Sequence, residues 1–227
     1  VTLEDGANTV VLGTNATDAG IVTVRGGTGD DAITGGAAAG TISGGAGSDV
    51  IDGSSGDDTI TGGVGVNDLA GGADDDQFIL GGTTDDANDS INGGGGTSDS
   101  LSVTATTDFA DTDANITNVE AVTIADGGAI DVDLTGQTEA FDVTGGDGAN
   151  AVTMGGGDDT VAGAAGDDAL VGGAGADTII GGAGVDTLTG GDGANTFVQT
   201  ADDGGDSTDF LNQDKAVFDE GVDVVTD

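Results

Sequence analysis

The stretch GGAGADTIIGGAGVDTLT, residues 172–189, contains the same nine-residue pattern twice. Each copy has glycine at positions one, two and four, aspartate at position six and a large apolar residue at position eight. Working outward, the nonapeptide continues without a gap over residues 145–198, and an earlier block covers residues 26–79. Each block holds six units in strict register, which indicates a repeat architecture and not random low-complexity sequence.

Position eight is apolar in every unit of both blocks. The twelve residues are Ile33, Ile42, Ile51, Ile60, Leu69, Phe78, Val152, Val161, Leu170, Ile179, Leu188 and Phe197. Position seven is mostly small or polar, so one side chain points inward and the next outward, as in a short strand. The other six residues must turn the chain, because glycine adopts a positive φ at little steric cost.

These features predict an all-β fold, a right-handed parallel β-roll or β-helix solenoid in which two nonapeptides make one circuit. Its core would contain only one large apolar side chain per nine residues. That burial is too small to offset the entropy lost by ordering a glycine-rich chain. We therefore expect folding to require a bound ligand.

Position six supplies the candidate ligand atoms, because eleven of its twelve residues carry a side-chain oxygen. The candidate metal ligands are Asp31, Asp49, Asp58, Asn67, Asp76, Asn150, Asp159, Asp168, Asp177, Asp186 and Asn195. Carbonyl groups of the turn glycines are further candidates, namely Gly27, Gly29, Gly45, Gly47, Gly56, Gly173, Gly175, Gly182 and Gly184. Carboxylate and carbonyl oxygens favour several Ca²⁺ ions over Mg²⁺, which requires a stiffer octahedron, and the absence of His and Cys argues against zinc and copper.

Consecutive units turn on opposite sides, so each metal ion is expected between unit n and unit n+2. In the first block the rows are Asp31, Asp49 and Asn67 on one side, and Asp58 and Asp76 on the other. In the second block they are Asn150, Asp168 and Asp186, and opposite them Asp159, Asp177 and Asn195. Gly40 interrupts one row, so its site is expected to be weak or empty.

The alternative is that these acids are solvated turn residues, since Asp and Asn favour turns. Fixed spacing beside obligate glycines argues against it. A second set of acids, at position five, is interpreted as outward charge. These are Asp30, Asp57, Asp75, Asp158 and Asp167.

The repeats resemble the glycine- and aspartate-rich nonapeptides of RTX proteins, GGxGxDxUx, which form calcium-binding parallel β-helices. GGAGADTII and GGAGVDTLT fit that pattern at every position. The resemblance implies a parallel β-roll, calcium held between turns, and export through a type I secretion system. GGAAAGTIS departs from it by lacking both the fourth glycine and the acid, and asparagine removes charge from three further sites.

The charge balance limits the partners. Arg25 and Lys215 are the only cations against 43 acids, giving a formal net charge of −41. Such a chain cannot neutralise phosphates, so nucleic acid is excluded as a direct partner. Composition alone is also compatible with disorder. No stretch is apolar enough for a transmembrane segment.

Composition divides the chain into five segments. We expect an N-terminal strand cap at 1–25, a first roll block at 26–79, a β-rich spacer at 80–144, a second block at 145–198, and an acidic cap or linker at 199–227. In the spacer, SLSV, AVTI, IDVDL and FDV alternate like strands without the GGxGxD turn, so conventional turns and little calcium are expected there. The spacer also resembles those of bacterial surface-layer proteins with RTX repeats. Its Glu120 is interpreted as structural, with a ligand or catalytic role as the alternative.

No catalytic site is expected. Without His, neither Ser nor Cys triads nor zinc peptidase motifs can form, and six Phe are few for sugar hydrolysis.

The favoured function is a secreted calcium-binding structural protein of the bacterial cell surface, with a homo-oligomer or calcium-bridged lattice and a cell-surface polysaccharide as partners. The alternative is the calcium-dependent export module of an RTX adhesin, toxin or hydrolase whose active domain lies elsewhere. We expect this sequence to be a piece of a longer or processed protein. Ice binding is disfavoured because position three lacks a row of threonines.

Overall fold

The computed structural model describes residues 1–12, 22–81, 88–104, 109–110, 116–125, 129–198, 215–217 and 224–226. The chain divides into two compact units. Unit 1 comprises Val1–Ala105 and Asn115–Ala121, and unit 2 comprises Thr106–Ala114 and Val122–Asp227. Each unit is described by itself, and the five segment boundaries expected from composition stay predictions.

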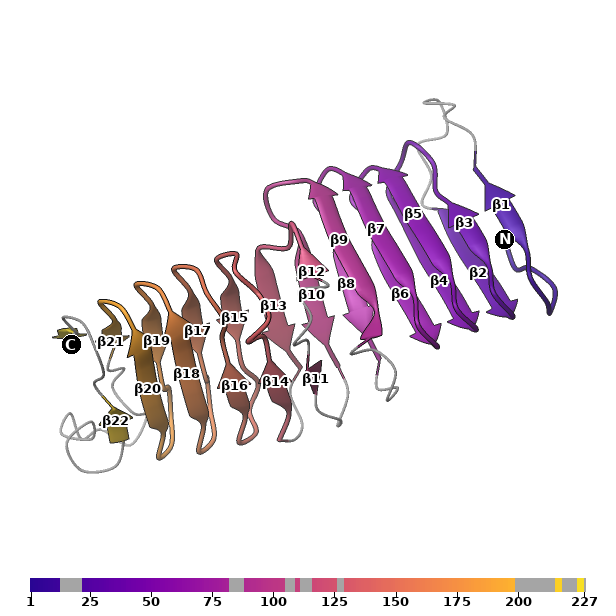
Figure 1. Ribbon diagram of the computed structural model, residues 1–227. Helices are drawn as coiled ribbons and strands as arrows, with labels where there is room; N and C mark the ends of the chain where they lie inside the picture. The colour runs from indigo at the N-terminus through magenta and orange to yellow at the C-terminus, as the bar shows by residue number, and fades with distance from the viewer. Residues whose placement is uncertain are drawn as a thin grey trace. The chain divides into compact units, whose positions relative to one another are not determined.

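Unit 1 consists of short parallel strands in two sheets (Figure 1). One sheet has the order β1 (Thr9–Val11), β3 (Ala32–Thr34), β5 (Val50–Ser55), β7 (Asp68–Ala73), β9 (Ser90–Gly95) and β12 (Ile116–Thr117). The other contains β2 (Val22–Thr28), β4 (Gly40–Ala46), β6 (Thr59–Val64), β8 (Gln77–Leu80) and β10 (Ser100–Val103). Successive strands alternate between the sheets, so the chain winds as a solenoid.

Unit 2 repeats this arrangement. One sheet contains β13 (Ala121–Ile124), β15 (Asp142–Thr144), β17 (Thr160–Ala162), β19 (Thr178–Ile180), β21 (Thr196–Val198) and β23 (Val224–Thr226). The other contains β11 (Phe109–Ala110), β14 (Asp131–Asp133), β16 (Ala151–Thr153), β18 (Ala169–Ala174), β20 (Thr187–Asp192) and β22 (Lys215–Val217). Within the described ranges every element is a strand and none is an α-helix. The predicted parallel β-roll is confirmed.

The register of the strands follows the repeat. Ile33 pairs with Ile51 and Ile51 with Leu69, each step covering 18 residues. In unit 2 Leu170 pairs with Leu188 in the same way. Two nonapeptides therefore make one circuit, as predicted from the spacing.

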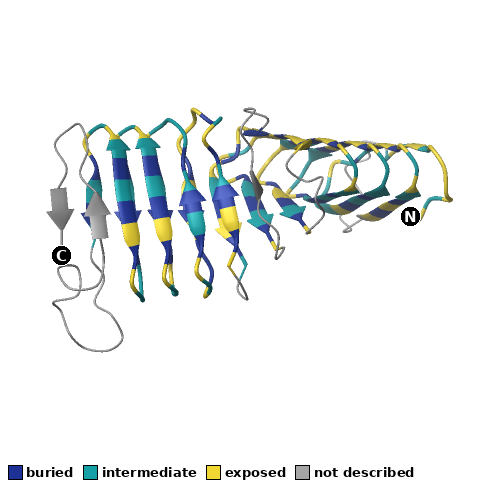
Figure 2. Cartoon of the chain, turned by 60° about the horizontal axis from the view of Figure 1, so that its bottom comes forward, coloured by how far each residue is buried: buried dark blue, intermediate teal, exposed yellow. Residues whose placement is uncertain are grey.

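The core is formed by the residues at position eight. All twelve are exposed by 2% or less. Along the strands, buried residues alternate with residues that face outward (Figure 2). The spacer adds buried side chains of its own, including Leu101, Val122, Val132 and Phe141. One inward side chain per short strand makes a narrow core, which agrees with the expectation from the sequence.

The spacer strands were predicted correctly from alternation. SLSV forms β10, AVTI forms β13, and parts of IDVDL and FDV form β14 and β15. They continue the parallel register, since Leu101 pairs with Phe78 and Val132 with Val152. Of the predicted C-terminal segment, only β22 and β23 lie within the described residues.

Most of the turns have a positive φ at positions two and four of the repeat, although Gly155, at position two, does not. In the unit that begins at Gly172, Gly173 has φ 95° and Gly175 has φ 149°. Where glycine is missing at position two, Ser54 and Ala164 still adopt φ values of 79° and 75°. The turn geometry is thus maintained even at residues that adopt it at a cost.

Candidate metal centre

The side chains at position six lie inside the turns and not in solvent. All eleven predicted side-chain ligands are exposed by 2% or less. Each Asp is held through one carboxylate oxygen, Oδ1, which accepts a hydrogen bond from a backbone N–H of the preceding circuit. Asp31 N–H donates to Asp49 Oδ1 at 2.8 Å, and Asp159 N–H donates to Asp177 Oδ1 at 3.0 Å. The donor is 18 residues earlier in both cases.

These hydrogen bonds join the position-six residues into rows. In unit 1 one row runs through Asn8, Asp31, Asp49, Asn67 and Asp89, and the other through Gly40, Asp58, Asp76, Asp99 and Glu120. In unit 2 one row runs through Asn150, Asp168 and Asp186, and the other through Asp159, Asp177 and Asn195. The predicted pairing of unit n with unit n+2 is confirmed. Whether these residues ligate a metal ion stays a prediction.

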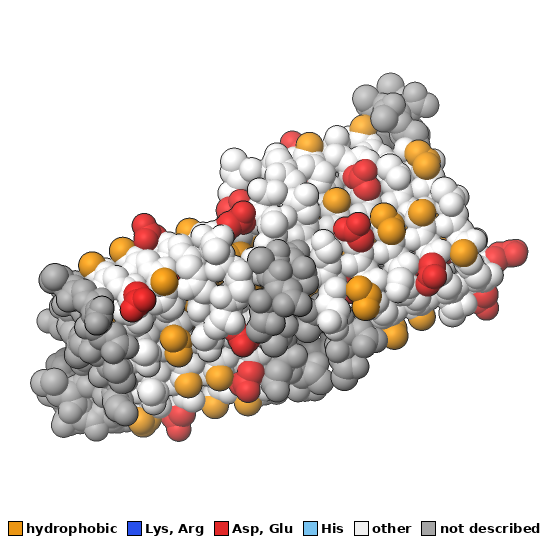
Figure 3. Space-filling view, viewed as in Figure 1, with side chains coloured by type: hydrophobic (Ala, Val, Ile, Leu, Met, Phe, Trp, Pro, Cys, Tyr) orange, Lys and Arg blue, Asp and Glu red, His pale blue; other side chains and the backbone are white. Residues whose placement is uncertain are grey.

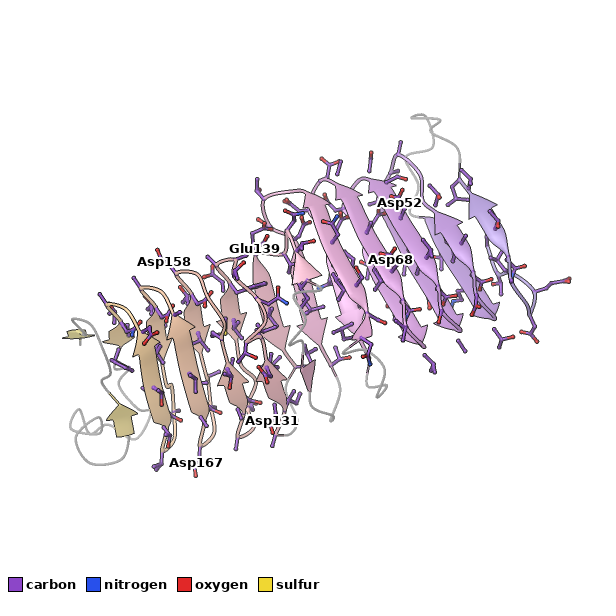
Figure 4. The ribbon with its side chains drawn as sticks, in the orientation of Figure 1. Asp52, Asp68, Asp131, Glu139, Asp158 and Asp167 are labelled. Carbon is purple, nitrogen blue, oxygen red and sulfur yellow. The ribbon has the colours of Figure 1, made fainter. Side chains whose placement is uncertain are left out.

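Consecutive turns lie on opposite sides of the roll. Asp158 and Asp167 are nine residues apart and are placed at opposite edges of unit 2 (Figure 4). Residues of adjacent nonapeptides therefore cannot share a site, as expected from the sequence.

The sequence analysis missed Asp89 and Asp99, which extend both rows of unit 1 into the spacer. Asn67 N–H donates to Asp89 Oδ1, and Asp76 N–H donates to Asp99 Oδ1, both at 2.7 Å. The spacings are 22 and 23 residues instead of 18, because the chain between the two bonded residues is longer there. Both acids precede residues 101–143, the stretch for which conventional turns were expected, so that expectation stays a prediction. The available signal was an acid two residues before a buried apolar residue, Ile91 or Leu101.

Glu120 completes the second row of unit 1. Its Oε2 accepts a hydrogen bond from Asp99 N–H at 2.8 Å. The predicted ligands make the same contact, so the structural interpretation of Glu120 stays a prediction. Gly40, as expected, supplies no side-chain oxygen, and only its N–H takes part by donating to Asp58 Oδ1.

The second carboxylate oxygen, Oδ2, has no hydrogen-bond partner in most of these turns. This holds for the buried Oδ2 atoms of Asp31, Asp49, Asp58, Asp76, Asp99, Asp159, Asp168 and Asp177. A buried carboxylate oxygen without a hydrogen bond or a counter-charge is costly, and the cost falls if a cation binds to it. The orphaned atoms therefore fit a cation site.

The glycine at position one makes room for this oxygen. A Cβ on Gly172 would lie 2.5 Å from Asp177 Oδ2 and 2.6 Å from the carbonyl oxygen of Gly190. The same cradle, occupied by the Oδ2 of position six, recurs at Gly26, Gly44, Gly53, Gly71 and Gly163. In these six turns, side-chain and backbone oxygens lie beside the space that a Cβ at position one would fill, whereas in the turn of Asp159 position one is Met154.

Burial changes the acidity of these groups. Desolvation raises the pKa of Asp76 to about 7, opposed by the hydrogen bond from Asp58 N–H and reinforced by the nearby charges of Asp58, Asp99 and Asp57. It raises the pKa values of Asp58, Asp159 and Asp168 to about 6. A carboxylate that resists ionisation when alone will bind a proton or a cation in preference to staying bare.

Backbone carbonyl groups must contribute to any cation site. Among the described residues, no three acidic side chains converge at one place. Carbonyl groups at positions two and four do face the position-six side chain. Asn150 Nδ2 donates to Gly146 O at 3.4 Å and to Gly148 O at 2.9 Å. By the equivalence of the repeats, this places the predicted glycine carbonyls beside the Asp side chains.

The acids at position five are exposed, as predicted, and they have a second role. Asp158 Oδ1 accepts a hydrogen bond from Ala176 N–H, and Asp167 Oδ1 accepts one from Val185 N–H, both at 2.9 Å. The donor is 18 residues later, the opposite direction to the bonds at position six. On the visible face, the exposed acids stand apart from each other among backbone and small side chains (Figure 3).

Comparison with protein families matches this architecture. Residues 16–42, 43–78 and 162–197 match the family described as "RTX calcium-binding nonapeptide repeat (4 copies)". These matches show that the chain contains RTX calcium-binding nonapeptide repeats. RTX repeats are typical of exported proteins. No curated protein matches the chain. In the part that the structure describes, no helix is long and apolar enough to cross a membrane.

Proposed function

We propose that this RTX protein is a secreted structural protein of the bacterial cell surface that folds and assembles when it binds calcium after export. The observation that supports it is the series of buried Asp Oδ2 atoms without partners, six of them beside a position-one glycine. Repeated sites along a narrow core indicate that the metal contributes to folding and not to catalysis.

The residues that would hold calcium are the Asp side chains at position six and the carbonyl groups at positions two and four. Calcium supplies positive charge at a place where the groups that would hold it are all oxygen atoms. The chain positions these oxygens through two sets of hydrogen bonds. Oδ1 is anchored to the preceding circuit, and the position-five acids anchor the following one.

Charge explains why folding would wait for export. With a net charge of −41 the compact chain repels itself, and the buried carboxylates add a desolvation cost. Where calcium is scarce, both costs favour the unfolded chain, which suits secretion. At millimolar calcium a site with Kd of about 10⁻⁴–10⁻³ M contributes only about 0.4–1.4 kcal/mol. Many stacked sites must therefore act together, and the transition should be steep.

A calcium titration tests the proposal. We expect the circular dichroism spectrum of the chain to be that of an unfolded protein in chelator and to gain β-signal cooperatively between micromolar and millimolar calcium. Magnesium at the same concentration should be much less effective because it binds few all-protein sites. A spectrum that chelator does not change would contradict calcium-coupled folding.

Substitution of a row residue tests the ligand assignment. Asp177→Ala removes the carboxylate that accepts from Asp159 N–H and lies beside Gly172, so we expect the calcium midpoint to rise several-fold. Asp158→Ala is the matched control, since Asp158 also accepts one backbone hydrogen bond but is exposed. Its effect should be less than about 1 kcal/mol. Equal midpoints for the two variants would refute the assignment.

Assembly into a layer is the finer part of the proposal. The stretch 79–161 lies between the residues that match the RTX repeat family and also forms strands where it is described. A chain of this organisation suits a structural element of a surface layer better than a short export module. Calcium bridges between exposed acids of neighbouring copies, or contacts with a surface polysaccharide, would hold the layer. Electron microscopy with and without calcium should show ordered arrays only with calcium. Dispersed particles in both conditions would favour the export module of an adhesin, toxin or hydrolase.

A further inference from the structure

In four turns of the described chain the residue at position six, or its equivalent, is asparagine and not aspartate. They are the turns of Asn8, Asn67, Asn150 and Asn195. Three of these side chains hold their oxygen as Asp does. Asn67 Oδ1 accepts a hydrogen bond from Asp49 N–H at 3.0 Å. Asn150 Oδ1 accepts one from Ile130 N–H at 3.3 Å, and Asn195 Oδ1 accepts one from Asp177 N–H at 2.9 Å. These bonds determine which end of each amide is oxygen, since a backbone N–H cannot donate to an NH₂ group.

The amide nitrogen then points at the carbonyl groups of its own turn. Asn67 Nδ2 donates to Gly63 O at 3.4 Å and Gly65 O at 3.2 Å, four and two residues earlier. Asn150 makes the same pair of contacts with Gly146 and Gly148. Asn8 Nδ2 donates at the same offsets to Glu4 O at 2.8 Å and Gly6 O at 2.5 Å, and Asn195 Nδ2 donates to Gly191 O at 3.2 Å.

This nitrogen occupies the place that Oδ2 takes in the aspartate turns. A Cβ on Gly62 or Gly190 would lie 2.6 Å from the Nδ2 of Asn67 or Asn195. A Cβ on Gly53 or Gly172 would lie 2.5 Å from the Oδ2 of Asp58 or Asp177. The same point in the repeat therefore carries two hydrogens in an asparagine turn and none in an aspartate turn.

The consequence follows from donors and acceptors. In an aspartate turn the buried Oδ2 has no hydrogen-bond partner. The position-two carbonyl group accepts at most a backbone N–H of the next circuit, as Ala164 O does from Ala183 N–H at 2.8 Å in the turn of Asp168. The second lone pair of that carbonyl oxygen and the bare Oδ2 are acceptors that a cation can satisfy.

In an asparagine turn the amide N–H groups donate to one or both of the carbonyl groups at positions two and four. Asn8 Nδ2 also donates to Asp31 Oδ1 at 2.9 Å, and Asn67 Nδ2 to both carboxylate oxygens of Asp89 at 3.2 Å. The NH₂ group cannot coordinate a cation. Adding a cation there would require these hydrogen bonds to break.

We propose that the asparagine turns are cation-independent, with the amide group taking the place of the calcium ion that the aspartate turns require. This inference rests on the proposed calcium function. It differs from the sequence-based prediction that Asn67, Asn150 and Asn195 are ligands. Asn8 and Asn150 are each the first residue of a row in their unit, within the described residues, to contribute a side-chain oxygen or nitrogen. The roll thus has turns that need no cation of their own and on which the aspartate turns stack.

Reciprocal isosteric substitutions test this. Asn150→Asp converts an asparagine turn into an aspartate turn. Asp168→Asn, in the next turn of the same row, does the reverse. Asp167→Asn is the control for Asp168→Asn, since it removes the same charge from an exposed neighbour. The measurements are calcium stoichiometry by equilibrium dialysis and the calcium midpoint by circular dichroism.

We expect Asp168→Asn to bind fewer calcium ions than the unsubstituted chain and to fold at a calcium concentration about two- to tenfold lower. Asn150→Asp should bind at least one more ion and need more calcium, or fail to fold when calcium is limiting. Asp167→Asn should retain the original stoichiometry. The inference is overturned if Asp168→Asn needs as much calcium as the unsubstituted chain, or if Asn150→Asp folds unchanged without gaining an ion.

A failure of the proposed function is distinguishable from a failure of this inference. If the unsubstituted chain does not respond to calcium, the proposed function is wrong. If it responds but the reciprocal variants do not shift in opposite directions, only the amide substitution is wrong.

Discussion

Gly175→Ala is expected to destabilise the roll by more than about 3 kcal/mol, even in saturating calcium. Gly175 has φ 149°, a conformation that a residue with a Cβ rarely adopts. The new methyl group would also collide with the carbonyl group of Gly157 in the neighbouring circuit. Because that atom belongs to the backbone, no side-chain rotation can relieve the collision. Urea unfolding monitored by circular dichroism measures the loss.

Gly156→Ala is the matched control in the same stack of turns. A Cβ there would have its nearest neighbours at 3.7 Å, an ordinary contact, and the φ of Gly156 is not positive. Alanine already occupies the paired position, Ala174. We expect a change within about 0.5 kcal/mol. If the two alanine variants were equally stable, the positive φ and close stacking of position four would not determine stability.

The second large effect concerns pH in the absence of calcium. The pKa values of Asp58, Asp159 and Asp168 are raised to about 6 and that of Asp76 to about 7, against 3.8 for an ordinary Asp. Burial is the main cause, and the charges of neighbouring carboxylates add to it. Between these values and 3.8 the folded chain binds protons that the unfolded chain does not. Stability without calcium should therefore fall as pH rises through about 6 to 7, and increase toward pH 4–5.

Circular dichroism in calcium-free buffer from pH 8 to pH 4 checks this. The β-signal should appear on acidification, and the calcium midpoint should rise as pH falls because protons compete for the same oxygens. Asp76→Asn removes the most strongly perturbed of the four groups and should flatten the transition more than Asp75→Asn, whose side chain is exposed. A calcium-free chain that loses structure between pH 7 and pH 5 would show that the buried carboxylates do not control folding.

Much of the fold follows from local spacing. Ile179 and Asp177 are two residues apart, so one strand residue between them places both side chains on the inner side. Their burial, the register of 18 residues and the separation of consecutive turns were all predicted from the nonapeptide. The sequence was informative here because every unit has the same length, and equal units can stack in only one register.

The extension of the rows to Asp89 and Asp99 was not predictable by counting. Additional residues in the chain change the spacing from 18 to 22 and 23 residues, so the period is lost in the sequence. The structure recovers it because the parallel ladder aligns Ser90 with Asp68 and Ser100 with Gln77 regardless of how many residues the turn contains. Strand pairing, and not sequence distance, decides which acids become neighbours.

The sequence by itself determined that this chain is a parallel roll with an oxygen-bearing residue in nearly every turn, because period and residue type are local properties. Only the tertiary structure decided what each oxygen or nitrogen faces. Asp168 and Asn150 look interchangeable as turn residues, yet an unpartnered Oδ2 belongs to one and a donating Nδ2 to the other. That difference depends on hydrogen-bond direction and on carbonyl groups contributed by the folded turns, neither of which spacing reveals.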